Sequence, residues 1–324
     1  MTHASNVLCF ALTAAILTSL TTACGDSSPP PEKKPLETDA SENLSQSELT
    51  ITSEDLTQSA AKQAVMGLIQ QLFSESTNAS LDLTKHTETF TQSPNEQSYQ
   101  ELLNAWQKAH QQYRLSQTSH IFNIEHPSFD ESVAAPHHTL DSRIDSFPLL
   151  PGYLDQVEGY PNSGLIYSEV DLSIEVLQTE HLFSDPAYVT LGFHAFDTVL
   201  QGDHQLPIKP WQRFAATGVE IQDKAALRRQ LYLQVIAKQL NTDISLEAND
   251  WLKPQGYYAA KFNLISPDAL KELANQAVNP STLDSYIAKE SEHSGEQTAK
   301  AVRATLEKLA LVANLEEAPE QTEP

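Results

Sequence analysis

Two side chains that can bind a metal lie three residues apart in the stretch VTLGFHAFDTVLQGD, residues 189–203. If this stretch is helical, His194 and Asp197 share one face and their Cβ atoms are roughly 5–6 Å apart. An imidazole nitrogen and a carboxylate oxygen at this spacing can hold one cation or hydrogen-bond to each other. The pair therefore has two interpretations, which are a metal site and a polar contact between packed helices.

The spacing alone does not decide between these interpretations. With 11 histidines and 43 acidic residues, chance gives about three such pairs, and the chain contains four. The pair at 194 differs from the others in its apolar surroundings, which are Val189, Leu191, Phe193, Phe196, Val199 and Leu200. A helix that is apolar around most of its circumference is expected to be buried, and a buried carboxylate needs a partner. Burial therefore favours a role for this pair.

Other polar residues could contribute to a cleft or to the surroundings of a metal. Arg143 and Asp145 lie in DSRIDSFPLL, where a local ion pair or turn competes with a contact to a ligand. Trp106 is expected in the core or in the wall of the cleft. Asp203 and His204 follow the helix closely enough to supply ligands, and otherwise they are solvated loop residues.

Two further groups of histidines are predicted to be solvated. Glu290, His293 and Glu296 stand among other charged residues, so we interpret them as an exposed helix face. His137 and His138 are expected in a loop.

Several common sites are absent from the sequence. It contains no His-Glu-x-x-His zinc motif, no Gly-x-Ser-x-Gly nucleophile elbow and no glycine-rich phosphate-binding loop. A net charge of −23 repels phosphate backbones and attracts cations. We therefore expect a cation as a partner and no nucleic acid.

The N-terminus resembles that of a bacterial lipoprotein. Residues 7–20 are apolar or small and too few to span a bilayer, which is typical of a signal-peptide core. The following Thr-Thr-Ala-Cys resembles the lipobox, in which the cysteine is acylated and becomes the new N-terminus. Cys24 would then be a lipid anchor in the cell envelope, and Gly25 after it favours the outer membrane over the inner one, with the protein facing the periplasm. Because Cys9 lies in the signal, no thiol remains for catalysis or for a disulfide.

Composition divides the chain into four parts. Residues 1–24 are the predicted signal peptide with the lipobox cysteine, and residues 25–56, rich in proline, serine and acids, form a disordered tether. Residues 57–315 form the folded domain, and residues 316–324 are a disordered tail.

The folded domain is predicted to be all-α. Apolar residues recur at helical spacing over residues 65–73 and 102–113, where His110 falls on the apolar stripe. The same spacing appears at 227–240 and 302–311, whereas residues 141–172 contain prolines and glycines and are expected to be irregular. We expect two packed helical bundles, at about 57–205 and 206–315.

Three stretches resemble the imelysin-like proteins. In GFHAFD, Gly192, His194 and Asp197 stand at the positions of their Gly-x-His-x-x-Glu signature. LLNAWQKAHQQY is similar to their Trp-bearing helix, and RIDSFPLLPGYLDQV followed by NSGLIYS is similar to their middle segment. Order and spacing agree over residues 56–315.

The resemblance implies two helical bundles with a cleft beside the signature helix, and a context of iron uptake in the cell envelope. It places His194 and Asp197 as metal ligands and Gly192 beside them. One position departs from the signature, because Asp197 replaces a glutamate and withdraws the carboxylate by about 1.5 Å. Metal–oxygen distances vary only by about 0.2 Å, so a shorter side chain requires an adjustment of the site. A closer helix, a bridging water or a weakened site would each be such an adjustment.

We expect a lipid-anchored periplasmic protein that binds a metal cation, iron with zinc as the alternative, or an iron-bearing ligand. A further partner would be an envelope protein of iron uptake. One alternative is a metallopeptidase of the imelysin type, in which the metal activates water. A second alternative is an interaction module of the envelope that binds no metal and in which the His194 pair is structural.

Overall fold

The structure is a computed structural model that describes residues 53–123 and 140–315. The predicted signal peptide with Cys24, nearly all of the predicted tether, the two loop histidines at 137 and 138 and the predicted tail lie outside the described residues. All described residues belong to one compact unit. Among them, no helix has both the length and the apolar character needed to cross a membrane.

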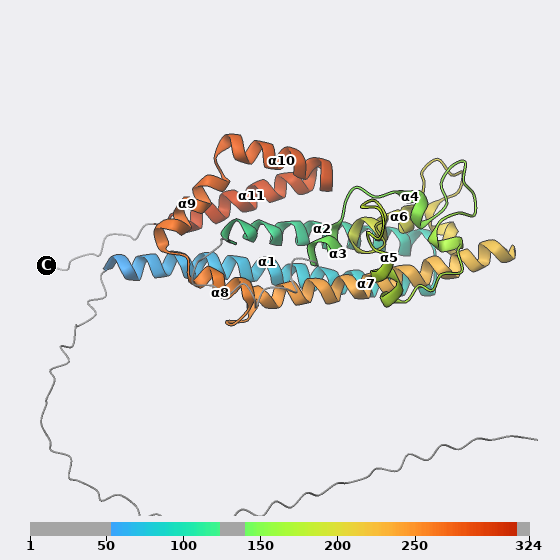
Figure 1. Ribbon diagram of the computed structural model, residues 1–324, viewed down its shortest axis with the longest axis horizontal. Coiled ribbons are helices and arrows are strands. Elements are labelled where there is room, and N and C mark those ends of the chain that lie inside the picture. Colours follow the sequence, from blue (N-terminus) through green and yellow to red (C-terminus); the bar gives the residue numbers. More distant parts are fainter. Residues whose placement is uncertain (1–52, 124–139, 316–324) are drawn as a thin grey trace, which may run out of the picture. The chain divides into compact units, whose positions relative to one another are not determined.

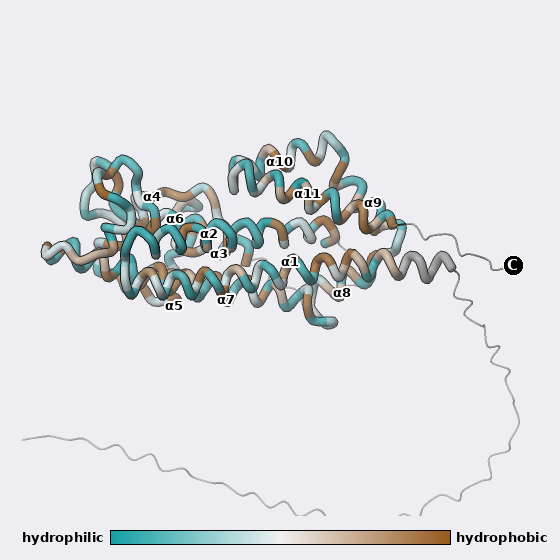
Figure 2. The backbone as a smooth tube through the Cα atoms, turned by 180° about the vertical axis from the view of Figure 1, so that it is seen from behind, coloured by the Kyte–Doolittle hydropathy of each residue, from teal (hydrophilic) through white to brown (hydrophobic). Residues whose placement is uncertain are grey.

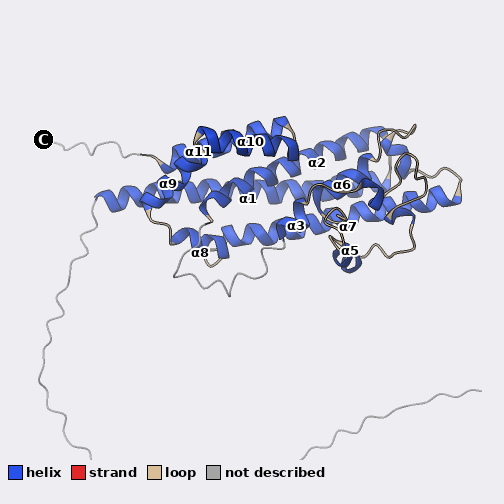
Figure 3. Ribbon diagram, turned by 45° about the horizontal axis from the view of Figure 1, so that its top comes forward, coloured by secondary structure: helices blue, strands red, loops and turns tan. Residues whose placement is uncertain are grey.

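Three long helices lie side by side. They are α1 (Ser53–Gln92), α2 (Glu96–Gln117) and α7 (Glu220–Leu252), and α1 packs against both of the others (Figure 1). The C-terminal part adds α8 (Tyr257–Asn263), α9 (Pro267–Ala277), α10 (Pro280–Ser294) and α11 (Glu296–Ala313). The described ranges contain helices and loops and no β-strand (Figure 3). The predicted all-α fold is therefore confirmed.

Local sequence explains where these helices begin. Asn95 caps α2, because its side-chain oxygen accepts a hydrogen bond from the backbone N–H of Ser98 at 3.0 Å. Ser266 caps α9 in the same way, and Pro267 follows at its first position, where no backbone donor is needed. The apolar stripes predicted the buried faces, since Val65, Ile69 and their neighbours along α1 are buried. Figure 2 shows such apolar residues recurring along the helices.

The core consists of two large apolar clusters. One joins α2, the C-terminal part of α1 and α7 to the middle of the chain, and it includes Phe90, Phe193, Phe196 and Tyr232. The other joins the start of α1 to α8, α9 and α11, and it includes Phe73 and Trp251. Each cluster takes residues from both predicted halves, and the boundary between two bundles near residue 205 stays a prediction.

The middle of the chain is irregular, as the prolines and glycines predict. Its short helices are α3 (Leu140–Asp145), α4 (Pro151–Leu154), α5 (Ile174–Glu180) and α6 (Gly192–Gln201), with 3₁₀ turns η1 (Thr118–Phe122), η4 (Leu165–Tyr167) and η5 (Pro210–Phe214). Such short elements have few internal hydrogen bonds, so tertiary contacts must hold them.

A buried ion network fixes this middle segment to α7. Asp155, just after α4, accepts hydrogen bonds from Arg229 Nε at 2.7 Å and Nη2 at 2.8 Å, and it also accepts from Arg213 Nη2. Arg229 donates further to the backbone oxygen of Arg213 at 3.2 Å. All three side chains are buried. One carboxylate therefore joins α4, η5 and α7.

Replacing this carboxylate should be costly. We expect Asp155→Ala to lower the free energy of unfolding by about 3–5 kcal/mol, because it leaves two buried guanidinium groups without their counter-charge. Urea unfolding of the purified protein measures the change. Glu169→Ala is the matched control, since Glu169 forms an ion pair with Lys224 on the surface, where screening leaves little effect. Equal stabilities of the two variants would contradict the role given to Asp155.

Candidate metal centre

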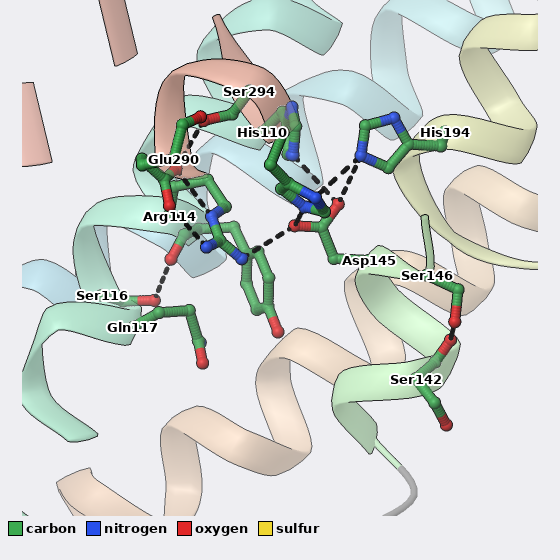
Figure 4. Close-up of polar contacts among 12 residues, drawn as sticks. His110, Arg114, Ser116, Gln117, Ser142, Asp145, Ser146, His194, Glu290 and Ser294 are labelled. Carbon is green, nitrogen blue, oxygen red and sulfur yellow. Dashed lines mark hydrogen bonds and ion pairs between the residues drawn. The ribbon is translucent and has the colours of Figure 1, made fainter. Parts of the chain in front are cut away.

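Four side chains that can bind a metal converge from four different helices. They are His110 of α2, Asp145 at the end of α3, His194 of α6 and His293 near the end of α10. One ligand atom from each lies within 4.8 Å of the corresponding atoms of the others. Figure 4 shows His110 and His194 directed at the carboxylate of Asp145. We call this group the His3-Asp cluster.

Asp145 is at the centre of the His3-Asp cluster. Its Oδ1 lies 3.0 Å from His110 Nε2 and 3.3 Å from His194 Nε2, and its Oδ2 lies 2.8 Å from His293 Nε2. The Nε2 atoms of His194 and His293 are 3.5 Å apart. Each histidine therefore presents the same ring nitrogen to one small volume.

Two of these atoms lack a properly aligned hydrogen bond. His110 Nε2 and Asp145 Oδ1 are buried and close, but neither has a partner within hydrogen-bonding angles. Buried polar atoms are normally satisfied, so such a pair calls for an explanation. Both atoms suit a third group bound between them, which is how ligands of one ion are arranged. The residues present therefore fit a metal ion.

The charges around Asp145 keep it ionised. Burial would raise the pKa of its carboxyl, but the imidazoles of His110, His194 and His293 hold that pKa well below its ordinary value. Arg114 Nη1 donates to Asp145 Oδ2 at 3.0 Å. The deprotonated carboxylate is the form that binds a cation.

Arg114 also ties the cluster to a second buried carboxylate. Its Nε donates to Glu290 Oε1 at 2.9 Å and its Nη2 to Glu290 Oε2 at 2.6 Å, a bidentate pair. Burial would raise the pKa of Glu290, but Arg114 lowers it below its ordinary value. Partners of this kind orient a ligand and tune its charge.

Gly192 explains how α6 approaches α3. Its φ is +91°, a conformation that residues with a Cβ rarely adopt. A Cβ at this position would lie 2.5 Å from the carbonyl oxygen of Ile144 and 2.8 Å from that of Arg143. The glycine thus lets the start of α6 touch the end of α3, which brings His194 to Asp145. This is a physical reason for the first position of the signature.

A second contact holds these two helices together. His181 Nε2 is 2.8 Å from the backbone oxygen of Ser142 in α3. Its Nδ1 accepts hydrogen bonds from the backbone N–H groups of Thr190 and Leu191 at 3.2 and 3.3 Å, just before α6. Burial lowers the pKa of His181, which favours the neutral ring that these contacts require.

Asp197 lies outside the His3-Asp cluster. Its Oδ1 accepts a hydrogen bond from Gln201 Nε2 at 2.6 Å, one turn further along α6. Burial raises the pKa of Asp197, in spite of the neighbouring amide and imidazoles. Of the signature pair, the structure brings His194 to the cluster and leaves Asp197 beside it. Direct binding of an ion by Asp197 stays a prediction.

The other predicted site residues have structural contacts. Trp106 Nε1 donates to the backbone oxygen of Phe193 at 3.0 Å, and its ring centroid lies 5.4 Å from that of His110. Arg143 pairs with buried Asp243 at 2.5 Å. Asp203 accepts hydrogen bonds from the backbone N–H groups of Gln205 and Glu158, and His204 is exposed. Trp106 therefore supports His110, whereas Arg143, Asp203 and His204 supply none of the ligand atoms of the His3-Asp cluster.

The prediction of an exposed face was wrong for two residues. Glu290 is buried and His293 is half-buried, because α10 folds back over α2 and places Glu290 beside Arg114 and His293 beside Asp145. Glu296 is exposed, as predicted. The local sequence of α10 is rich in charge and gives no sign of this packing.

Sequence reasoning also missed His110 as a member of the His3-Asp cluster. The sequence did contain a signal, because this histidine stands on the apolar stripe of its helix. A polar ring nitrogen at a core position needs a partner, and here it lies 3.0 Å from the carboxylate of Asp145 without an aligned hydrogen bond.

A comparison with protein families now bears on this geometry. A family model described as Imelysin matches residues 69–316. The chain belongs to the imelysin family. The predicted resemblance is confirmed, and all three stretches that suggested it fall within the matched residues, as do all four residues of the His3-Asp cluster. No curated protein matched the chain.

In this imelysin domain, Gly192→Ala tests the contact between α6 and α3. We expect it to lower the free energy of unfolding by about 1–3 kcal/mol, because of the positive φ and the two carbonyl oxygens. Denaturant unfolding measures the loss. Gly67→Ala is the control, because Gly67 lies within α1 with open space around it and should gain about 0.5–1 kcal/mol from its helical position. A loss in both variants would count against the packing argument.

Asp197→Asn tests the signature acid. Because burial raises its pKa, the charged form of Asp197 destabilises the folded chain at any pH above its ordinary pKa of about 3.9. We expect the amide, which still accepts from Gln201, to raise the free energy of unfolding at neutral pH. The gain should shrink as the pH falls through the raised pKa of the folded state and disappear below the ordinary pKa of about 3.9, where the wild-type carboxyl is protonated in both states.

The same variant decides whether Asp197 binds an ion. Calorimetric titration with zinc should give the wild-type affinity for Asp197→Asn and a weaker affinity for Asp145→Asn, because only Asp145 lies in the cluster. The reverse order would make Asp197 the ligand.

Proposed function

We propose that this imelysin-family protein binds a metal cation in the His3-Asp cluster. The ligands are the Nε2 atoms of His110, His194 and His293 and the carboxylate of Asp145. The observation that supports it is the convergence of these four atoms from four separate helices. Nitrogen and oxygen atoms that bind one ion, each about 2.1 Å from it, lie about 3–3.5 Å apart. The distances from Asp145 to the three histidines, at 2.8 to 3.3 Å, and the 3.5 Å between His194 and His293 are close to this range, and all four atoms lie within 4.8 Å of one another.

The charge of the buried groups supports a cation. With neutral imidazoles, Asp145 and Glu290 carry two negative charges and Arg114 carries one positive charge. One negative charge remains in a buried environment, where it is costly. A metal ion would balance it, or a proton on one imidazole would do so in its absence, so binding should displace protons.

The cation is iron, with zinc as the alternative. Three imidazoles and one carboxylate suit both metals and exclude magnesium and calcium, which prefer oxygen ligands. Iron is the choice because of the context that the family resemblance implies. The acidic chain, at −23, raises the local concentration of cations around the domain.

The protein acts in the cell envelope, in iron uptake or iron homeostasis. Cys24 carries the lipid, residues 25–52 before α1 form the tether, and the helical domain faces the periplasm from the outer membrane. The support for this location is the lipobox-like sequence and the composition of the tether. An envelope protein of iron uptake is the partner that would supply or receive the ion.

Metal binding is tested with His293→Ala. We expect it to lower the affinity for ferrous and zinc ions by about 10–100-fold or more, measured by calorimetry and elemental analysis. His204→Ala is the control, because His204 is exposed and outside the cluster. Saturating metal should also raise the melting temperature of the wild type, and a chelator should reverse the rise, because the ion binds only the folded chain.

Two outcomes would replace this function. Equal affinity in His293→Ala and wild type would remove the cluster as the metal site, and no binding in either would favour the interaction module. Cleavage of an unfolded substrate that stops with chelator and in His194→Ala would instead establish a metallopeptidase.

A further inference from the structure

The His3-Asp cluster has a buried side and a side that solvent reaches. The side chains of Asp145 and His110 are 4% and 5% exposed, whereas those of His194 and His293 are 13% and 22% exposed. An ion that enters from solvent therefore meets His194 and His293 first.

Other side chains close the buried side. Arg114 and its partner Glu290 cover one edge of Asp145. Phe193 and Trp106 pack against the ring of His110, with centroids 4.9 and 5.4 Å from it. These side chains fill the space on the buried side, so an ion cannot reach the cluster between them.

A cavity of about 430 Å³ offers a second approach, between α2 and the turn that joins α10 to α11. Of the four cluster residues, only His110 lines it, together with Gln111 and other polar residues. Because His110 is buried, an ion from this cavity would have to displace the ligand ring itself. The cavity therefore borders the cluster without opening into it.

Phe147 lies on the side that solvent reaches. Its ring centroid is 4.9 Å from that of His194 and 5.6 Å from that of His293, to which it is nearly perpendicular. The residue is nevertheless 53% exposed. A large apolar side chain is thus kept at the surface, in contact with the two accessible ligands and two positions after Asp145.

We propose that Phe147 is the gate of the cluster, and that a single cation enters and leaves past its ring. This inference rests on the proposed function. The ring covers the two outer histidines, so a hydrated ion must shed water to pass, and a bulky chelate is held out. The face of an aromatic ring attracts cations, which lowers the cost of that passage.

The position of Phe147 allows such movement. It lies in the irregular stretch between α3 and α4, outside any helix. Its half-exposed side chain can therefore change rotamer without breaking helical hydrogen bonds, and rotations of exposed side chains are fast. The four ligands stay in place, because they are held by helices and by Arg114.

The test measures rates of metal exchange on the full protein. Zinc-loaded wild type and Phe147→Ala are mixed with an excess of a colorimetric chelator in a stopped-flow instrument, and zinc uptake is followed separately. We expect Phe147→Ala to speed both uptake and release by about tenfold, because the apolar cover over a site controls access to it. The equilibrium affinity and the melting temperature should remain those of the wild type, since no ligand has changed.

Two control variants make the result specific. Leu150→Ala removes another half-exposed apolar side chain from the same stretch, and Gln111→Ala widens the cavity beside His110. Both should exchange zinc at the wild-type rate. Faster exchange in Gln111→Ala alone, or unchanged rates in Phe147→Ala, would overturn the gate. A wild type that binds neither zinc nor iron would instead overturn the proposed function, so the two failures are distinguishable.

Discussion

The carboxylate of Asp145 is buried among three imidazoles and one guanidinium, and the arrangement of the site depends on this charge. A buried carboxylate is stable only while its partners remain in place. Its partners come from α2, α6 and α10, so the same charge that could bind a metal also joins separate parts of the chain. A cation in the cluster would add to this cohesion. Without a cation, a proton on one of the histidines would have to balance the remaining negative charge.

The rest of the structure serves to bring these partners together. Long helices supply a rigid frame, in which His110 and Arg114 lie one turn apart on α2. The irregular middle segment cannot hold itself, and it is fixed by the Asp155 network, by His181 and by the close contact at Gly192. Asp155, His181 and Gly192 supply no ligand atom to the cluster, yet their contacts together place Asp145 and His194 next to each other.

The replacement of glutamate by Asp197 takes on a different meaning in this setting. The cluster obtains its carboxylate from Asp145, so a shorter acid on α6 does not leave the histidines without an anionic partner. Asp197 instead pairs with Gln201 within its own helix. Of the His-x-x-Asp pair on α6, His194 thus belongs to the cluster and Asp197 to its surroundings, while the other three cluster residues come from different helices.

Much of the fold followed from the sequence alone. Periodic apolar residues predicted the long helices, prolines and glycines predicted the irregular middle, and the signature identified His194 and the family. These features are local, because a helix is specified by residues three and four positions apart. The convergence of His110, Asp145 and His293 depends instead on how helices pack, over separations of up to 183 residues in the chain. Charged neighbours made His293 and Glu290 look exposed, and only the packing of α10 over α2 buries them. The sequence thus determined the helices and one residue of the cluster, and tertiary structure decided the other three, because burial and proximity arise only when distant segments meet.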